Sequence, residues 1–238
     1  MLSGMSTTQL LIRVIGLLLV IISASLHEFG HAYAAHLLGD DTAKEMGRLT
    51  PNPLAHIDPF GSVILPMLLI MSGGGFIAYA KPMPFNPNRL RNPRRDEALV
   101  ALAGPACNLL QAMVGAVVFR ILLAVVYGNS YPTYYVDHSA ISWLLVTFET
   151  YVYVNCSLAF FNLIPLPPLD GSKILSLVVT GDARRIYNNV QRNAMPILLI
   201  AIYVLPRIAA MTGLPWLDFI STWLDFTAGN VANWLLGW

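Results

Sequence analysis

Charged side chains are what this sequence has least of. Only 11% of its 238 residues are Asp, Glu, Lys or Arg, whereas 56% are hydrophobic. An ordinary soluble domain carries about 25% charged residues, so the composition excludes that class and indicates an integral membrane protein. The net charge of +1 at pH 7 also provides no basic surplus of the kind that binds nucleic acid.

Cysteine is scarce as well. The two cysteines, Cys107 and Cys156, both lie in apolar stretches, which favours small packing residues over a disulfide or a metal site. The sequence has no internal repeat. Its start does not read as a cleavable signal peptide, because the apolar run over residues 10–38 is too long and contains a His/Glu cluster. We therefore expect a single membrane-embedded domain over residues 1–238.

Long hydrophobic runs are what the sequence does contain. Transmembrane helices are predicted at residues 8–38, 98–127, 139–164 and 194–211. The run 61–80 contains Pro66 and breaks at Gly73–Gly75, so we expect a re-entrant helix that continues as an extended segment. The last stretch, 214–238, is either a final span or an amphipathic helix at the membrane surface.

The predicted fold class is an all-α polytopic membrane protein. Its core, over about residues 8–180, holds three transmembrane helices and the re-entrant helix/β segment, and one or two further helices occupy about residues 194–238. The partner that this fold requires is the lipid bilayer.

Two histidines stand four residues apart in the first predicted span, in the sequence His27-Glu28-Phe29-Gly30-His31. Positions i and i+4 of a helix share a face, so both imidazoles can bind one Zn²⁺, with Glu28 beside a metal-bound water. Zinc lowers the pKa of that water to about 7, and a neighbouring carboxylate can take its proton. A central charge in a membrane helix costs about 2.5–3.5 kcal/mol on insertion scales, so these groups indicate a function.

Asp170 is the best candidate for a third ligand, since a catalytic zinc typically has three protein ligands. It follows residues 165–168, where three prolines break the third predicted span. A broken helix whose carboxylate turns inward is expected where backbone lines a polar cavity. The metzincin arrangement would need a histidine six residues after His31, but Leu37 occupies that position.

The distribution of Lys and Arg brings Asp170 to the side of the membrane on which the His pair lies. If 61–80 is re-entrant, eleven of the fourteen basic residues fall on cytoplasmic loops by the positive-inside rule. These are Lys44, Arg48, Lys81, Arg89, Arg91, Arg94, Arg95, Lys173, Arg184, Arg185 and Arg192. A full span at 61–80 would put the most basic loop outside and Asp170 at the wrong face. We therefore expect the zinc site to face the cytoplasm.

The paired motifs resemble those of the site-2 proteases, the zinc intramembrane metalloproteases. The resemblance covers about residues 10–180 and rests on the His27–His31 motif and on Asn162-Leu163-Ile164-Pro165-Leu166-Pro167-Pro168-Leu169-Asp170-Gly171. The element Gly104-Pro105-Ala106-Cys107-Asn108 is similar to the Gly-Pro-x-x-Asn element of the helix between them. A PDZ or CBS domain, which this family often carries, has no room here, so the chain resembles a minimal member.

The resemblance implies one Zn²⁺ per chain, bound by His27, His31 and Asp170, with Glu28 as the general base. It also implies that Asn162 contacts the substrate backbone or the oxyanion. The implied activity is hydrolysis of peptide bonds in transmembrane substrate helices, in a membrane that is by analogy the prokaryotic plasma membrane.

A substrate helix hydrogen-bonds its own carbonyl groups, so it must unwind before it is cut. We expect the stretch 73–84 to hold the unwound strand by strand addition. His56 lies in the loop that follows the predicted helix with His27 and His31. It either polarises the substrate carbonyl or the leaving group, or it is an ordinary loop histidine.

Two other functions stay open on the sequence. A transporter or channel would use His27, Glu28, His31, Glu149 and Asp170 as an ion path, although the spacing of the His pair and the prolines before Asp170 argue against it. An inactive membrane chaperone on the protease scaffold is disfavoured because no expected catalytic group is missing. The sequence predicts a transmembrane protein or peptide as substrate and gives no oligomeric state.

Overall fold

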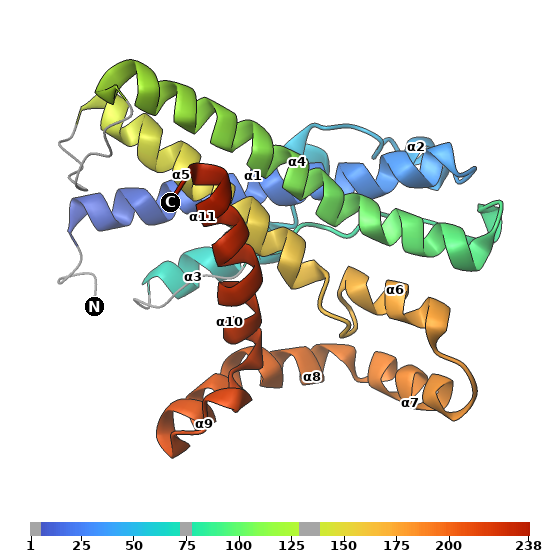
Figure 1. The fold of residues 1–238 in the computed structure, drawn as a ribbon. Helices are drawn as coiled ribbons and strands as arrows, with labels where there is room; N and C mark the ends of the chain where they lie inside the picture. Colours follow the sequence, from blue (N-terminus) through green and yellow to red (C-terminus); the bar gives the residue numbers. More distant parts are fainter. Residues whose placement is uncertain (1–5, 72–77, 129–138) are drawn as a thin grey trace.

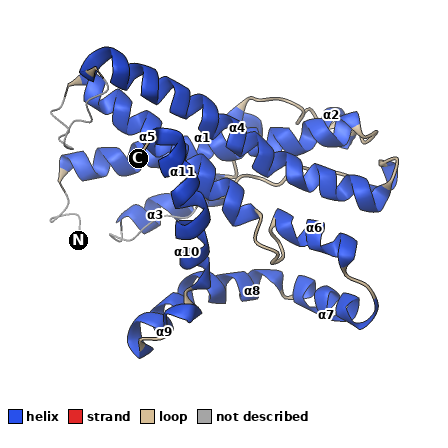
Figure 2. Ribbon diagram, in the orientation of Figure 1, coloured by secondary structure: helices blue, strands red, loops and turns tan. Residues whose placement is uncertain are grey.

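Three long helices form the centre of the fold, which is a computed structural model describing residues 6–71, 78–128 and 139–238. They are α1 (Thr7–Leu37), α4 (Pro93–Tyr127) and α5 (Ala140–Asn162), and they pack side by side (Figure 1). Within those described ranges every regular element is helical and none is a strand (Figure 2). The predicted all-α fold class is therefore confirmed.

Local sequence signals set the ends of these helices. Ser6 caps α1 in a capping box with Gln9. Pro93 is the first residue of α4, and Gly128 ends it with φ of 58°, a left-handed conformation that glycine adopts without strain. Between them, small residues of α4 such as Ala112 line the core against α5, which lets the helix axes come close.

Four helices are long and apolar enough to cross a membrane, and they correspond to the four predicted spans. The fourth, Ala194–Thr212, consists of α8 (Ala194–Leu199), the π-helical turn η5 (Ile200–Val204) and α9 (Leu205–Thr212). The chain is accordingly a multi-pass membrane protein. Short helices of the first half include α2 (Thr42–Glu45), η2 (Pro53–Ala55) and η4 (Pro87–Arg89).

The segment that follows the first span folds back, so that its start and its end lie close together. It forms η3 (Pro59–Ile64) and α3 (Leu65–Met71), and the chain after residue 78 runs back beside its start. The N–H of Tyr79 donates to the carbonyl of Gly61 at 3.2 Å, and the Ser62 hydroxyl donates to the carbonyl of Tyr79 at 2.7 Å. These bonds bring the two ends of the segment together, as a re-entrant segment requires.

The predicted extended segment is only partly within the described residues. Residues 78–86 form neither helix nor strand, whereas the predicted break at Gly73–Gly75 and residues 76–77 lie outside the described ranges. The backbone of this segment is held by the loop before it, since Arg48 donates to the carbonyls of Lys81 and Pro82 and the N–H of Lys81 donates to the carbonyl of His56.

The C-terminal part crosses the bundle. After η6 (Pro215–Leu217), the helices α10 (Phe219–Leu224), η7 (Asp225–Gly229) and α11 (Asn230–Leu236) run across α4 and α5 (red in Figure 1). Arg120 of α4 donates to the carbonyls of Leu235 and Trp234 at 2.7 and 3.0 Å, and the indole N–H of Trp223 donates to the carbonyl of Phe160 at 3.0 Å. This stretch packs on the bundle and is not one of the four long apolar helices.

Two further helices link the third and fourth spans. They are α6 (Asp170–Val178) and α7 (Gly181–Arg192). Asp170 is the first residue of α6, and it follows a tight turn at residues 163–169 in which the amide of Leu166 donates to the carbonyl of Ile164. The proline-rich turn therefore ends α5 and turns the start of α6 toward α1 and α4.

Candidate active site and metal centre

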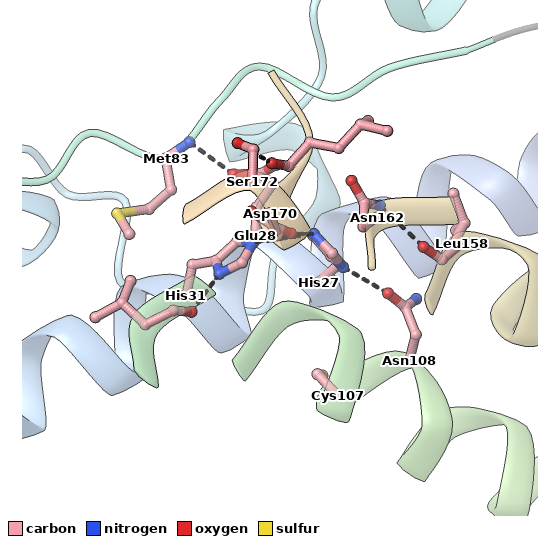
Figure 3. Close-up of polar contacts among 12 residues, drawn as sticks. His27, Glu28, His31, Met83, Cys107, Asn108, Leu158, Asn162, Asp170 and Ser172 are labelled. Carbon is pink, nitrogen blue, oxygen red and sulfur yellow. Dashed lines mark hydrogen bonds and ion pairs between the residues drawn. The ribbon is translucent and has the colours of Figure 1, made fainter. Parts of the chain in front are cut away.

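Three side chains predicted as metal ligands converge between α1, α4 and α6 (Figure 3). The Nε2 atoms of His27 and His31 lie 2.9 Å apart, and both face Asp170 Oδ2, at 3.1 and 3.2 Å. All three side chains are buried. In tetrahedral coordination with bonds of about 2.0–2.1 Å, ligand atoms lie about 3.3 Å apart, so the spacing fits a single zinc ion.

The hydrogen bonds of the two Nδ1 atoms determine that the Nε2 atoms of His27 and His31 present lone pairs to the centre of the site. His31 Nδ1 lies 2.7 Å from the carbonyl oxygen of Val100, which can only accept, so Nδ1 carries the hydrogen. His27 Nδ1 lies 2.5 Å from Asn108 Oδ1, which also accepts. Both Nε2 atoms of the neutral rings therefore present lone pairs. Asp170 Oδ2 is buried and receives no hydrogen bond from any of the described residues.

Three acceptor atoms that face one another without a proton between them are unfavourable unless a cation lies among them. The observed donor set, two imidazole nitrogens and one carboxylate oxygen, is the kind that binds catalytic zinc. The residues therefore fit the metal. Among the described residues, this trio is the group of ligating side chains that could hold an ion, and neither His56 nor Glu149 belongs to it.

A buried amide network reaches the site from α5 and was not predicted from the sequence. Asn108 Nδ2 donates to Asn155 Oδ1 at 2.9 Å, and Asn155 Nδ2 donates to the hydroxyl of Ser23 at 2.9 Å. All three side chains are fully buried. The network holds the Asn108 amide with its oxygen toward His27. The sequence signal that could have indicated this network is the presence of asparagines inside apolar helices.

Gly104 of α4 lines the site where the two rings meet. A Cβ atom at this position would lie 2.4 Å from His31 Nε2 and 2.6 Å from His27 Cε1. Any side chain would occupy the place of the rings. The glycine of the Gly-Pro-x-x-Asn element is thus required by close approach, and the asparagine of the same element binds His27.

Glu28 is half-buried, and its carboxylate is held from the loop side of the site. Glu28 Oε2 accepts a hydrogen bond of 2.6 Å from the backbone N–H of Met83 (Figure 3). The site therefore has two sides, one of helices that carry the three predicted ligands and one of irregular chain that contacts Glu28.

The remaining two predicted site residues, Asn162 and His56, form hydrogen bonds with residues close to them in the sequence. Asn162 is the last residue of α5, and its Nδ2 donates to the carbonyl of Leu158 at 2.9 Å. His56 is fully buried, with Nε2 2.8 Å from the carbonyl of Thr50 and Nδ1 3.5 Å from Nη2 of Arg48. His56 thus supports the loop beside segment 78–83, and the predicted substrate contacts of both residues stay predictions.

Residues 15–135 and 132–205 match the family described as Peptidase family M50. "Putative zinc metalloprotease YwhC" of Bacillus subtilis is 39% identical over 165 residues, which cover 69% of each chain. Two proteins named "Putative zinc metalloprotease Rip2" are also similar. That of Mycolicibacterium smegmatis is 33% identical, covering 69% of this chain and 57% of the relative. That of Mycobacterium tuberculosis strain H37Rv is 30% identical, covering 76% and 63%. No solved structure matches.

Proposed function

Because this chain belongs to peptidase family M50 and is a zinc metalloprotease, we propose that it cuts peptide bonds within transmembrane helices of other proteins. His27, His31 and Asp170 bind the zinc, and Glu28 is the general base. The observation that carries this proposal is the convergence of three deprotonated ligand atoms beside a carboxylate, among helices long and apolar enough to span a membrane.

The chemistry of the chain's own groups follows from this arrangement. Zinc, when bound, polarises a substrate carbonyl and lowers the pKa of a water. Glu28 takes the water's proton and passes it to the nitrogen of the leaving amide. The N–H of Met83 binds one carboxylate oxygen at 2.6 Å, which leaves the other to accept the proton. The Nδ1–H bonds of the two histidines keep the rings in the orientation that metal binding needs.

The substrate strand binds along segment 78–82. In extended chain, the N–H and C=O groups of successive residues point to opposite edges. The N–H and C=O groups of Tyr79 and Lys81 form hydrogen bonds with the re-entrant segment and with the loop that carries Arg48 and His56. Ala80 therefore offers its N–H and C=O on the other edge, where an unwound peptide can add as a strand.

A cavity of about 470 Å³ supports an approach of the substrate along α5. Thr150, Ser157 and Phe161 of α5 line it, together with Ala78 of the extended segment. The hydroxyls of Thr150 and Ser157 make no hydrogen bond to any part of the chain that the structure describes, whereas those of Thr147, Thr212 and Thr227 each bond back to their own helix. They can serve carbonyls that an unwinding helix releases, and Asn162 lies at the end of the same helix.

The orientation that we propose puts the zinc site toward the cytoplasm of a prokaryotic plasma membrane. The loops that carry eleven of the fourteen basic residues, with α6 and α7, lie at one end of the bundle, and the start of α1 and the end of α4 lie at the other (Figure 1). The positive-inside rule assigns the first end to the cytoplasm.

The test is metal content and peptidase activity measured on the same detergent-purified sample. Wild type is compared with Glu28→Gln and with Glu45→Gln, a control carboxylate that pairs with Arg89 on the surface. The substrate is a transmembrane peptide with a helix-breaking centre. We expect one zinc per chain in all three proteins and cleavage in wild type and Glu45→Gln only. Cleavage by Glu28→Gln at the wild-type rate would remove Glu28 as the base.

The same preparation tests the ion-path alternative. A protein without zinc that conducts ions across liposomes, and that cuts no peptide, would overturn the protease proposal. The trio of deprotonated ligand atoms favours the protease, because a proton path needs groups that can exchange protons with one another.

A further inference from the structure

Arg48 is a buried cation whose hydrogen bonds go to backbone carbonyls instead of a carboxylate. Its side chain is 8% exposed. Nη1 donates to the carbonyl of Pro82 and Nη2 to the carbonyl of Lys81, each at 2.7 Å. Burying a guanidinium is costly unless its donors are satisfied. The carbonyls that satisfy Nη1 and Nη2 lie 34 and 33 residues further along the chain, whereas the buried Nε has no partner among the described residues.

The carbonyl that Nη1 binds belongs to the peptide group that binds Glu28. The C=O of Pro82 and the N–H of Met83 form one planar unit, and in the trans form the two groups point in opposite directions. Arg48 holds the oxygen of this unit, and Glu28 Oε2 accepts from its N–H at 2.6 Å. A fixed oxygen in a rigid plane therefore fixes the direction of the N–H.

The same peptide unit transmits charge as well as geometry. A cation at a carbonyl oxygen draws electron density from the amide nitrogen, so the N–H becomes a stronger donor, and hydrogen bonds in series reinforce one another. Arg48 thus strengthens the hydrogen bond that orients Glu28 without touching Glu28 itself.

His56 and Thr50 hold the guanidinium in place. His56 Nε2 donates to the carbonyl of Thr50 at 2.8 Å, so its Nδ1 carries the lone pair and faces Arg48 Nη2 at 3.5 Å. The backbone carbonyl of His56 accepts from the N–H of Lys81 at 2.8 Å. The loop around Arg48 is thereby joined to the segment before Met83 at several points.

We propose that Arg48 is the positioning residue for the catalytic carboxylate, acting on Glu28 through the peptide group between Pro82 and Met83. The proposal rests on the proposed role of Glu28 as the general base. It assigns the loop after α1 a part in the reaction, although the outer nitrogens of the two histidines bond to Asn108 and Val100 of α4 and not to this loop.

The experiment compares Arg48→Ala and Arg48→Lys with wild type, and uses Arg89→Ala as the control. Arg89 also donates to two oxygen atoms from one guanidinium, but it binds Glu45 on the surface. Turnover is measured with a short unstructured peptide, so that substrate unwinding does not enter. Zinc content, and hydrogen exchange of the peptide covering residues 81–86 with the zinc removed by a chelator, are measured on the same samples.

For Arg48→Ala we expect kcat to fall by about 100-fold, the size expected when a catalytic group is misplaced by about 1 Å. Zinc content is expected to stay at the wild-type level, and the amide of Met83 to exchange faster. Arg48→Lys keeps the positive charge but lacks the two parallel N–H donors of the guanidinium. Its kcat is expected to lie between those of wild type and Arg48→Ala. Added guanidinium ion is expected to restore part of kcat in Arg48→Ala and to leave wild type and Arg89→Ala unchanged.

Three outcomes would overturn the proposal. They are a wild-type kcat in Arg48→Ala, loss of zinc or of folding in both Arg48 variants, and a Met83 amide that exchanges at the wild-type rate in Arg48→Ala. If wild type cut no peptide, the function proposed above would fail. The exchange of Met83 in Arg48→Ala and Glu28→Gln would still test the link, since both are expected to release this amide.

Discussion

The two sides of the active site are built in different ways. The ligand side consists of His27, His31 and Asp170 on helices, with Asn108 and Val100 of α4 behind the rings. The loop side consists of irregular chain, the loop 48–62 and the segment 78–83, and it contacts Glu28 through one backbone amide. Two neighbouring residues of α1, His27 and Glu28, are therefore supported by parts of the chain that differ in structure and in distance along the sequence.

We expect this difference to separate metal binding from catalysis. Helices give the ligand side its rigidity, because each side chain is fixed by the regular backbone and by burial. The loop side depends on a few hydrogen bonds from distant residues, and such regions open more easily than packed helices. Damage to the ligand side should remove the metal, whereas damage to the loop side should leave the metal and slow the reaction.

The strongest test of the ligand side is Gly104→Ala. The added Cβ would lie 2.4 Å from His31 Nε2, and the ring cannot turn away without losing its bond to Val100. We expect loss of nearly all bound zinc and of all activity, measured as metal per chain by elemental analysis. Gly229→Ala is the matched control, since its Cβ would meet only the carbonyl of Leu224 at 3.9 Å. A Gly104→Ala protein with a full zinc complement would contradict the assignment of this site.

A smaller effect on the same side is expected from Asn108→Leu. The change removes the acceptor of His27 Nδ1–H, and loss of such a supporting bond typically lowers metal affinity about 10- to 100-fold. Zinc affinity is measured by competition with a chelator. Asn155→Leu, one step further away, is expected to have a weaker effect of the same kind.

Asn230→Leu provides the control, because Asn230 is exposed on α11 and donates to the carbonyl of Phe226 one turn before it. If Asn108→Leu and Asn230→Leu bound zinc equally well, the amide network would have no part in metal binding.

On the loop side, Gly61→Ala is expected to lower activity without loss of zinc. The added Cβ would lie 2.2 Å from the ring of Tyr79. This ring is 43% exposed, so it can turn outward and shift the extended segment instead of unfolding it. We expect a several-fold loss of kcat/KM with wild-type zinc content. Loss of zinc in this variant would show that the two sides of the site are not separable.

The smallest effect concerns Asp40, which ties the loop side to the end of α1. Burial raises the pKa of Asp40, but hydrogen bonds from the Thr42 hydroxyl and from the backbone amides of Asn86 and Thr42 lower it more, so the net pKa is below its usual 3.8. A carboxylate with a lowered folded-state pKa adds stability that is complete above the unfolded-state pKa. That stability is lost as the pH falls through the folded-state pKa.

Wild type is therefore expected to lose thermal stability below about pH 4, the ordinary range of an aspartate, and Asp40→Asn is expected to show a weaker dependence there. The measurement is the unfolding midpoint between pH 7 and the acid range, with Asp182→Asn as the control on exposed α7. Equal pH profiles of the two variants would remove Asp40 as the cause.

Much of the fold could be predicted from hydrophobic patterning. All four spans were predicted, with ends within a few residues, except that α4 begins at Pro93 instead of Ala98. This difference arises because the first turn of the helix contains the charged residues Arg94, Arg95 and Asp96, which an apolar pattern does not record. The course of 214–238 was left open, since its polar stripe suits both arrangements. Only its packing on α4 and α5 decides that it crosses the bundle.

The sequence by itself predicted the spans and the His pair as zinc ligands, because helical periodicity fixes where side chains i and i+4 point. It predicted the approach of Asp170 from the distribution of Lys and Arg over the loops. The tertiary structure alone decided that Asn108 and Val100 orient the rings, that Met83 holds Glu28, and that His56 lies beneath Arg48 instead of among the ligands. The contacts that hold the two rings and Glu28 join residues 55 to 81 positions apart. No local pattern encodes which carbonyl or amide such a side chain meets, since that depends on how the whole chain closes.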